Sequence, residues 1–495
     1  MRRRLLFVIL SATLFVLLRF SPPLPELFGR DAGRQVIQRV ITKTEQRVIT
    51  KTEAGVEFAV DQRWLQVPMD WEEPNGRRIR LRYYVFGKHG TEPLVYLAGG
   101  PGGSGTREVT HTFAGLFDLL SRDRQIVAVD QRGAPSSDPT LNCPTPLTYP
   151  LELPVDRGSI LRKARSWAAQ CVDHWRRQGI DLSDFHTGNS LEDLEALRKS
   201  LGAEKLDLLG FSYGTQLALA YARKYPDHVN RMVLVGTEGP DHTFKLPSSG
   251  DRTLSRLEDH LGTLASPEGG TSNPSDLLHR ALSRLEEGPA VLKVTDPMTN
   301  QPAVLSLGKF DVQLFVASSL GSRQALDRLV PTLQQMASGN FSGMARAIVF
   351  LRQGGGRSMA LPYLVDCAAG ASPERMARIQ KEANESLLDN ALNRLLPEAC
   401  EFFPHGSLAE EFRERLPAME IPVLFISGSL DGRTPPSNAE EVRTSFPRST
   451  LVVIEGASHD TLLASPELWK LVAEFTRDGD SLIGKRLTIN LDPPP

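Results

Sequence analysis

The sequence predicts an α/β protein, in which helices cover both faces of a mostly parallel sheet and a long, mainly helical segment is inserted between two of its strands. Short apolar segments alternate with helical patterns, as is typical of parallel strands joined by crossover helices. We expect strands at 94–98, 125–130, 205–209, 231–236, 422–427 and 450–454. Between the fourth and fifth of these, leucines recur at helical spacing, which predicts an inserted helical cap.

The first folded segments predict an antiparallel hairpin instead of a crossover unit. Residues 64–69 and 79–86 are strand-like, and residues 72–76 between them are rich in turn formers. With the inserted cap, this pattern divides the chain into an export segment (1–20), a spacer (21–55), a first core part (56–240), a helical cap (241–415), a second core part (416–480) and a tail (481–495).

The amino terminus has the pattern of an export signal. Three arginines precede an apolar stretch at residues 5–18, and prolines follow it. The stretch is short for a membrane-spanning helix, yet no small-x-small cleavage pattern follows it, so a cleaved signal and an uncleaved membrane tether both stay open. We expect an exported protein that is periplasmic or secreted.

The octapeptide QRVITKTE occurs twice in succession, at 38–45 and 46–53. Because the repeat stops after two copies, it indicates a local duplication and not a solenoid. Its mixed charge and its position before the predicted hairpin favour a spacer. Binding of a partner is the alternative.

The cysteines form an even set that an oxidising compartment can pair: Cys143, Cys171, Cys367 and Cys400. Three pairings are possible, of which nearest-neighbour pairing would close one loop in each half of the molecule. Four buried thiols are the alternative. No pair has C-x-x-C spacing, which disfavours a metal site.

The charge and the glycine pattern bear on cofactors and nucleic acids. Lysine and arginine number 57 and aspartate and glutamate 59, so the net charge of −2 provides no basic surface for nucleic acid. Residues 100–105 satisfy G-x-G-x-x-G and Asp130 follows the next predicted strand, which is also the arrangement of a dinucleotide site. However, Pro101 stands in the tight turn and lacks an N–H. We therefore expect no cofactor. Because the cysteines also lack metal-ligand spacing, we expect no bound metal. The oligomeric state stays open.

A serine nucleophile is predicted at Gly210-Phe-Ser212-Tyr-Gly214, between a predicted strand and a helical segment. In this context the glycines permit a sharp turn that exposes the serine hydroxyl. A serine hydroxyl is a poor nucleophile, so it needs a histidine base and an acid that orients the base.

The acid and the base are expected later in the chain, with the acid first. Asp431 follows the strand at 422–427, His459 follows the strand at 450–454, and no other histidine lies beyond Asp431. Asp460 and Glu455 are competing acids, but the first is adjacent to the base and the second lies back on the strand. The predicted triad is therefore Ser212, His459 and Asp431.

The glycine-rich loop has a role in the same chemistry. A serine hydrolase of this topology needs backbone N–H groups directed at the developing oxyanion, and we expect them to come from Gly100 and Tyr213. Asp130 and Arg132, after the next strand, are expected to brace the loops beneath this edge.

Six stretches together resemble the prolyl-aminopeptidase and tripeptidyl-aminopeptidase family of α/β-hydrolase serine peptidases. They are VPMDWEEPNG (67–76), GGPGGSG (99–105), DQRG (130–133), GFSYG (210–214), GSLD with TP (428–431 and 434–435) and GASH (456–459). The resemblance implies the α/β-hydrolase fold, the same triad, and release of residues or short peptides from peptides with free N-termini. The cysteines also look like the exported branch of the family. Ala98, Ala134-Pro135 and Ser458 depart from the family's usual residues, which weakens an expectation of proline selectivity.

Aminopeptidase activity also needs an anionic group that holds the substrate ammonium. Glu238, just after the strand at 231–236, is the best placed, ahead of Asp241, Asp366 and Glu401. An esterase or lactonase with the same triad, and a non-catalytic binding protein on the same scaffold, are the alternatives, because the fold alone does not fix the reaction.

Overall fold

A computed structural model of the chain describes residues 38–42, 45–51, 57–90, 92–261, 273–296, 299–355, 358–479 and 484–490. The predicted export segment at 1–20, with its tether at 5–18, lies outside these residues. In the described ranges, no helix is both long and apolar enough to span a bilayer.

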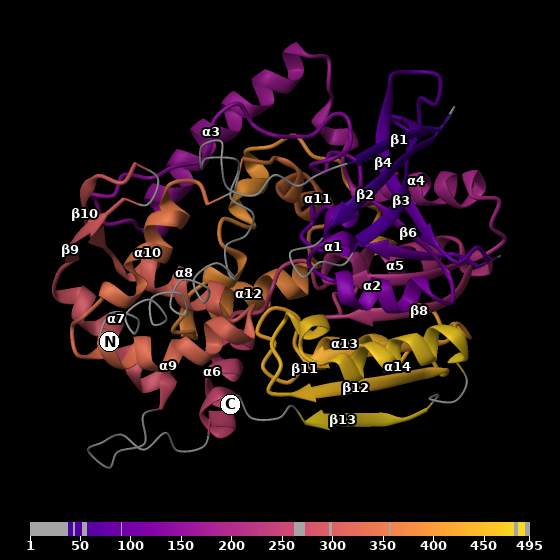
Figure 1. The fold of residues 1–495 in the computed structure, drawn as a ribbon. Helices are drawn as coiled ribbons and strands as arrows, with labels where there is room; N and C mark the ends of the chain where they lie inside the picture. Colours follow the sequence, from indigo (N-terminus) through magenta and orange to yellow (C-terminus); the bar gives the residue numbers. More distant parts are fainter. Residues whose placement is uncertain are drawn as a thin grey trace, which may run out of the picture.

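The described core is built on an eleven-stranded sheet with the order β1-β2-β3-β4-β6-β5-β7-β8-β11-β12-β13 (Figure 1). The strands are β1 (Gln38–Thr42), β2 (Glu45–Lys51), β3 (Glu57–Pro68), β4 (Arg78–Gly87), β5 (Leu94–Leu97), β6 (Gln125–Val129), β7 (Leu206–Phe211), β8 (Val229–Val235), β11 (Val423–Gly428), β12 (Ser449–Glu455) and β13 (Arg486–Asn490). The first four are antiparallel to their neighbours, and from β6 to β13 every pair is parallel. The predicted hairpin and all six predicted strands are present.

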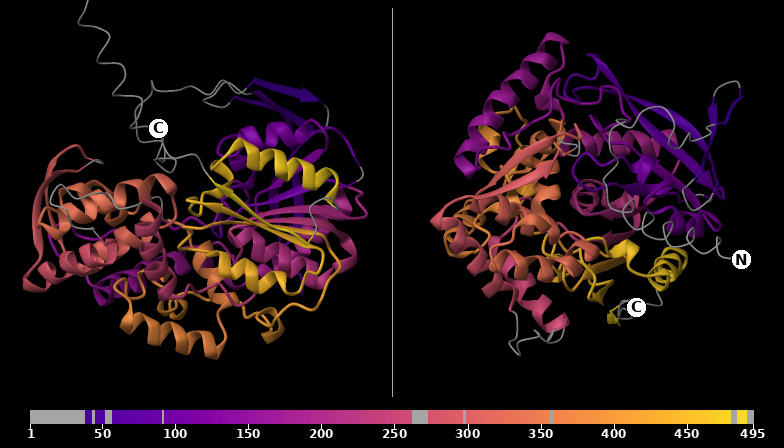
Figure 2. Two further views of the ribbon diagram at one scale, coloured as in Figure 1. Left: turned by 90° about the horizontal axis from the view of Figure 1, so that it is seen from below. Right: turned by 60° about the vertical axis from the view of Figure 1, so that its left-hand side comes forward.

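Helices cover both faces of this sheet, as predicted. They are α1 (Gly105–Thr110), α2 (Ala114–Ser121), α4 (Thr187–Ser200), α5 (Tyr213–Lys224), α13 (Pro436–Arg443) and α14 (Pro466–Arg477), with the short 3₁₀ turns η1 (Leu182–Asp184), η2 (Pro226–His228) and η6 (Thr461–Leu463). Strand side chains alternate between two hydrophobic clusters: Leu208 and Leu234 pack beneath α4 and α5, while Leu209 and Val233 pack beneath α2 and α14. Figure 2 shows helices on both sides of the sheet.

The insertion between β8 and β11 forms a mainly helical cap with one small hairpin. Its elements are α6 (Pro247–Leu261), α7 (Pro274–Glu287), β9 (Ala290–Thr295), β10 (Pro302–Leu307), α8 (Lys309–Ser319), α9 (Arg323–Ala337), α10 (Ser342–Arg352), α11 (Leu361–Ala369), α12 (Pro373–Glu385), η3 (Ala391–Asn393), η4 (Glu398–Glu401) and η5 (Glu410–Phe412). In Figure 1 the parallel strands point their carboxyl ends toward this cap. The cap therefore lies over the sheet edge at which the predicted triad residues are expected.

The boundary predicted at residue 240 does not separate cap from core completely. Helix α3 (Arg157–Arg177), which follows β6, packs on the cap. The Arg157 guanidinium binds the Glu398 carboxylate at 2.7 Å and the Leu396 carbonyl at 3.1 Å. The cap is thus assembled from two insertions, the second much longer than the first.

The interpretation of 21–55 as a spacer is wrong for the doubled octapeptide. The first copy supplies β1, and β2 runs from Glu45, the last residue of that copy, into the second copy. These two strands pair with each other, and β2 also pairs with β3. Valine, isoleucine and threonine favour strands, and Val48 is buried against the sheet's hydrophobic cluster. The spacer interpretation used only the repetition and the mixed charge, and it left out the strand propensity of the repeated residues.

The carboxyl-terminal segment 481–495 is likewise not only a tail. Residues Arg486–Asn490 form β13, which pairs in parallel with β12. Leu487 and Ile489 alternate with polar residues and pack against the hydrophobic cluster, so this short segment can occupy a sheet edge with one apolar face.

The structure joins Cys143 to Cys171 and Cys367 to Cys400, which is the nearest-neighbour pairing of the three possible ones. The first disulfide fastens the loop after β6 to α3. The second joins α11 to η4, so both crosslinks lie in the segments that build the cap.

Candidate active site

Ser212 lies in a tight turn between β7 and α5. Its backbone has φ 54° and ψ −123°, a region that non-glycine residues rarely adopt and that is characteristic of functional sites. A Cβ at Gly214 would lie 2.0 Å from the Leu97 carbonyl oxygen, and one at Gly210 would lie 2.6 Å from the Gly214 carbonyl oxygen. Both glycines are therefore required by close backbone packing, and the turn carries the serine at the carboxyl end of β7.

The structure brings the three predicted triad residues together from three separate strand ends. His459 Nε2 lies 2.9 Å from Ser212 Oγ, and His459 Nδ1 lies 2.8 Å from Asp431 Oδ2. Both are hydrogen-bond distances. The resulting chain of polar groups runs from hydroxyl to imidazole to carboxylate.

Asp431 is buried among hydrogen-bond donors. Besides His459, its carboxylate accepts hydrogen bonds from the N–H groups of Arg433 (2.8 Å) and Thr434 (2.9 Å) and from the Thr434 hydroxyl (2.8 Å). Burial alone would raise the pKa of Asp431, but the interactions with His459 and Thr434 outweigh burial and lower it. Asp431 is thus an ionised partner for the imidazole at neutral pH.

The imidazole is also enclosed by residues that the sequence interpretation did not assign to the site. Its ring lies 5.1 Å from the Phe211 ring, and the Thr434 hydroxyl lies 3.0 Å from Nδ1. Gly236, at the end of β8, has φ 62°, and a Cβ there would lie 3.1 Å from His459 Cε1. A glycine directly after a buried strand was the sequence signal that could have identified this close approach.

The glycine-rich loop lies directly beside Ser212. A Cβ at Gly99 would lie 3.0 Å from the Ser212 Cβ, and the loop is closed by a hydrogen bond from Gly103 N–H to the Gly99 carbonyl (3.0 Å). Gly100 has φ 120°, in the region that favours glycine. Tyr213 is the first residue of α5, so its N–H has no acceptor within the helix.

Asp130 and Arg132 brace this region. Asp130 accepts hydrogen bonds from the hydroxyls of Ser104 (2.9 Å) and Thr106 (2.6 Å), which follow the glycine-rich loop. Arg132 is buried and binds both oxygens of Asp193 at 2.7 Å. These contacts fix the loops that follow β5 and β6.

Glu108 lies beneath the glycine-rich loop and was not singled out from the sequence. The Tyr96 hydroxyl donates a hydrogen bond to Glu108 Oε2 (2.5 Å), and a Cβ at Gly103 would lie 2.7 Å from Glu108 Oε1. Burial raises the pKa of Glu108 to about 7; the Tyr96 hydrogen bond opposes this shift and the charge of Asp130 adds to it. No sequence pattern distinguishes this residue from an ordinary helix glutamate.

The four carboxylates considered for the substrate ammonium fall into two groups. Glu238 is buried and pairs with the Lys245 ammonium. Burial, and the nearby charge of Glu238, raise the pKa of Asp366 on α11 well above its usual value. Both charges also act on the Tyr213 phenol. By contrast, Asp241 accepts hydrogen bonds from the N–H (2.7 Å) and hydroxyl of Ser372 at the start of α12.

Glu401 is the most exposed of these carboxylates. It lies at the end of η4 and forms an ion pair with Arg165 on α3 at 3.2 Å. The structure therefore groups Glu238 and Asp366 near Tyr213, whereas Asp241 and Glu401 serve contacts within the cap.

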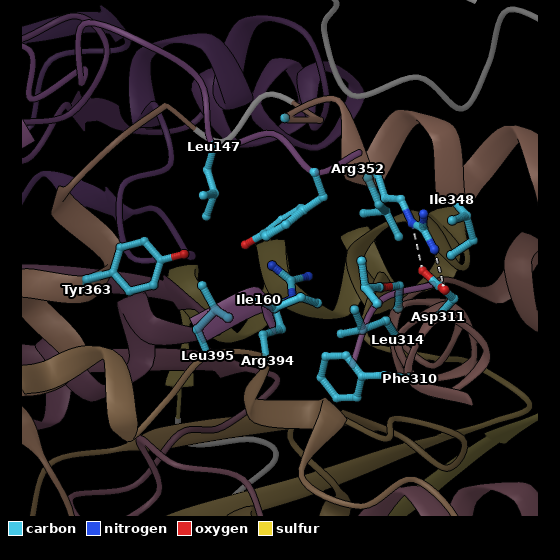
Figure 3. A pocket seen from close by; sticks show the side chains of 15 residues that line it. Leu147, Ile160, Phe310, Asp311, Leu314, Ile348, Arg352, Tyr363, Arg394 and Leu395 are labelled. Carbon is cyan, nitrogen blue, oxygen red and sulfur yellow. Dashed lines mark hydrogen bonds and ion pairs between the residues drawn. The ribbon is translucent and has the colours of Figure 1, made fainter. Parts of the chain in front are cut away.

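A cavity opens within the cap, among α3, α8, α10 and α11 (Figure 3). Its volume is about 50 Å³, and it is partly open to solvent. Its walls are mostly apolar, with Leu314, Ile348 and Leu395 among them, and Figure 3 shows Tyr363 and Arg394 extending into it. Helix α11, which contributes Tyr363 to the cavity, also approaches the glycine-rich loop, because a Cβ at Gly102 would lie 3.6 Å from the Leu361 side chain.

In the ranges that the structure describes, no three histidine, cysteine or acidic side chains are grouped so as to hold a metal ion.

Two family models match the two core segments. One, described as alpha/beta hydrolase fold, matches residues 92–265, and the other, described as TAP-like protein, matches residues 387–481. Ser212 lies in the first match, and Asp431 and His459 lie in the second.

Curated relatives carry peptidase and hydrolase names. Tripeptidyl aminopeptidase of Streptomyces lividans is 36% identical over 193 residues, covering 36% of this chain and 35% of that protein. Serine protease Hip1 of Mycobacterium tuberculosis is 31% identical over 187 residues, or 36% of each chain. Putative hydrolase YuaR of Escherichia coli is 23% identical over 397 residues, covering 76% of this chain and 75% of that one.

The match thus spans about a third of the length of the first two relatives. These relatives agree with the two family models, with the sheet covered by helices on both faces, and with the sequence stretches noted above. The chain therefore carries an alpha/beta hydrolase domain and a TAP-like domain, and over about a third of its length it is similar to proteins named tripeptidyl aminopeptidase and serine protease.

Proposed function

We propose that the protein is an exported serine aminopeptidase that releases single residues or short peptides from peptides with free N-termini. The observation that carries the proposal is the chain of hydrogen bonds from Ser212 Oγ through His459 to Asp431 at the carboxyl edge of the sheet. The names of the relatives, tripeptidyl aminopeptidase and serine protease, support a peptide substrate. Two disulfides support residence in an oxidising compartment.

In the proposed reaction, His459 Nε2 takes the proton of Ser212 Oγ while the oxygen attacks the substrate carbonyl carbon. The N–H groups of Gly100 and Tyr213 donate to the oxyanion of the tetrahedral intermediate. Collapse of the intermediate breaks the C–N bond, and the leaving amine receives the proton from His459. Asp431 keeps the imidazole in the tautomer with its proton on Nδ1 and stabilises the imidazolium.

The second half of the reaction regenerates the serine. Water loses a proton to His459 Nε2 and attacks the acyl ester on Ser212. The bond between the acyl carbon and Ser212 Oγ then breaks, Oγ takes the proton back from His459, and the amino-terminal fragment is released as a carboxylic acid.

We further propose that Glu238, together with Asp366, holds the substrate ammonium. Glu238 contributes to the raised pKa of Asp366, and a cation bound between two neighbouring carboxyl groups relieves such repulsion. Lys245 already shares the Glu238 carboxylate, so the ammonium would bind beside an ion pair. The cap, which we place at 241–415 with α3 added, would enclose the amino-terminal end of the peptide.

The test uses purified protein with aminoacyl, dipeptidyl and tripeptidyl p-nitroanilides, each with a free and with an acetylated N-terminus. We expect turnover of the free series only, and a loss on the order of 10⁴-fold or more in Ser212→Ala. Glu238→Gln should raise KM for the free series. Equal turnover by wild type and Ser212→Ala would contradict the proposal.

The other outcomes separate the alternatives. Hydrolysis of p-nitrophenyl esters without hydrolysis of any anilide would indicate an esterase. Absence of turnover together with absence of Ser212 labelling by a fluorophosphonate probe would indicate a binding protein on the hydrolase scaffold.

A further inference from the structure

The turn between α8 and α9, residues 320–323 of the cap, contacts both loops that carry the acid and the base. The Leu320 carbonyl accepts hydrogen bonds from the Ser458 hydroxyl (3.0 Å) and from the Gly432 N–H (3.4 Å). Ser458 immediately precedes His459, and Gly432 immediately follows Asp431. One carbonyl group of the cap thus bridges the two loops.

The residue on the other side of His459 contacts the same turn. Both carboxylate oxygens of Asp460 accept from the Arg323 N–H, at 3.1 and 3.2 Å. Arg323 is the first residue of α9, and the side chain of Ser322 at the N-cap makes no capping hydrogen bond. A carboxylate at a helix N-terminus is favourable, so Asp460 caps this cap-domain helix from the core.

Two further contacts close the junction. The Arg323 guanidinium donates a hydrogen bond to the Gly456 carbonyl, at the beginning of the loop that carries His459. A Cβ at Gly432 would lie 2.8 Å from Leu320 Cβ, and one at Gly321 would lie 3.2 Å from Arg433 Cδ. The turn is therefore close-packed between the two loops and is not a loosely apposed lid.

We propose that Ser458 and Asp460 are positioning residues, which fasten the loop of His459 to the cap turn at 320–323 and so keep the imidazole within reach of both Ser212 and Asp431. The inference rests on the proposed function for its effect on catalysis. Its physical basis is that residues 456–460 leave the sheet after β12, so hydrogen bonds outside the sheet must fix the ring. A displacement of about 1 Å at a reacting group can cost roughly 100-fold in rate.

Asp460→Ala and Ser458→Ala test the proposal. For Asp460→Ala we expect kcat, and the rate of Ser212 labelling by a fluorophosphonate, to fall together by about 100-fold while KM changes less than about threefold. Asp460→Asn keeps one oxygen that can accept from the Arg323 N–H and should recover most of the loss. Ser458→Ala, the milder change, should lower both rates by about tenfold.

The matched control is Asn273→Ala. Asn273 caps α7 of the same cap domain by accepting from Ser275 N–H (2.8 Å) and Asp276 N–H (3.3 Å), and it does not contact the catalytic loops. Its loss should lower Tm to an extent similar to Asp460→Ala and leave kcat and the labelling rate unchanged. If Asp460→Ala lowers only Tm, as this control does, the positioning role is wrong.

Amide hydrogen exchange provides a readout that does not depend on activity. Peptides that cover 456–461 should exchange faster in Asp460→Ala and in Ser458→Ala, but not in Asn273→Ala. Unchanged exchange in both loop variants would overturn the proposal even if the wild type is active. If faster exchange occurs but no Ser212-dependent turnover exists in the wild type, the fastening stands and the proposed function fails.

Discussion

Two carboxylates at the same edge of the sheet, the buried Asp431 and the partly buried Glu108, have different environments. Asp431, in the loop after β11, accepts hydrogen bonds from four donor groups, including His459 Nδ1. Glu108, beneath the loop after β5, accepts one from Tyr96 and lies near the charge of Asp130. Burial alone would raise the pKa of both groups. Only at Asp431 do the donors outweigh burial, so its pKa is lowered, whereas that of Glu108 rises to about 7.

The difference between these two carboxylates comes from their hydrogen-bond donors, which outweigh burial at Asp431 and do not outweigh it at Glu108. It also predicts opposite effects of pH on stability. The lowered pKa of Asp431 stabilises the fold above the ordinary pKa of an aspartate, and this contribution is lost as the pH falls. The raised pKa of Glu108 contributes stability that is complete below the ordinary value of 4.5 and is lost as the pH rises through about 7.

The largest expected effect comes from removing the charge at Asp431. Asp431→Asn keeps the size of the side chain, but its amide can present an N–H to His459 Nδ1 and favour the wrong tautomer. We expect kcat for a free-amine anilide to fall by about 10⁴-fold, with circular dichroism unchanged. Asp478→Asn, an exposed carboxyl, is the control, and a loss smaller than about tenfold in Asp431→Asn would contradict the assigned role.

The carboxyl group of Glu108 is expected to affect the pH dependence of stability. Glu108→Gln is neutral at every pH, so it should abolish the stability loss that accompanies ionisation of Glu108. From the shift of 4.5 to about 7, and about 1.4 kcal/mol per pKa unit, the wild type should lose about 3 kcal/mol of unfolding free energy on going from acid pH to pH 9 that the variant retains.

Urea denaturation at pH 5, 7 and 9 measures this difference. At pH 5 the two proteins should have similar midpoints, and at pH 9 Glu108→Gln should be the more stable. Glu474→Gln, which changes an exposed helix carboxyl, should follow the wild type at all three values. A Glu108→Gln variant that is less stable than the wild type at pH 9 would show that the carboxylate is stabilised in its charged form.

The same comparison indicates what the sequence could and could not predict. Asp431 was predictable because it follows a buried apolar strand, and because chain order pairs it with a single later histidine. The parallel strands and their order of appearance were also predictable, because the strands are short, apolar and separated by helical patterns. In these places local pattern and tertiary role agree.

Glu108 was not predictable, because nothing in its local sequence indicates that Tyr96 and Gly103 will enclose it. Similarly, Lys245 and Glu238 are seven residues apart in a loop pattern, and only the packed structure shows that they neutralise each other. The contacts of Asp460 depend on a cap turn more than a hundred residues earlier. Side-chain environments that arise between distant segments are the part that single-sequence patterns do not contain.

The smallest expected effect isolates the one donor that Glu108 has from Tyr96. The Tyr96 hydroxyl opposes the upward shift of the Glu108 pKa, so Tyr96→Phe should raise that pKa further and move the pH at which stability is lost to a higher value. The loss of one hydrogen bond to a carboxyl group should cost about 1 kcal/mol at pH 9, and less at pH 5, where Glu108 is protonated. The urea midpoint measured in steps between pH 5 and pH 9 gives the displacement of the transition.

In the Glu108→Gln background the same tyrosine change should leave the pH dependence flat. A transition that moves to lower pH in Tyr96→Phe would mean that the hydroxyl favours the protonated carboxyl, and the count of donors would then no longer explain why Glu108 and Asp431 differ.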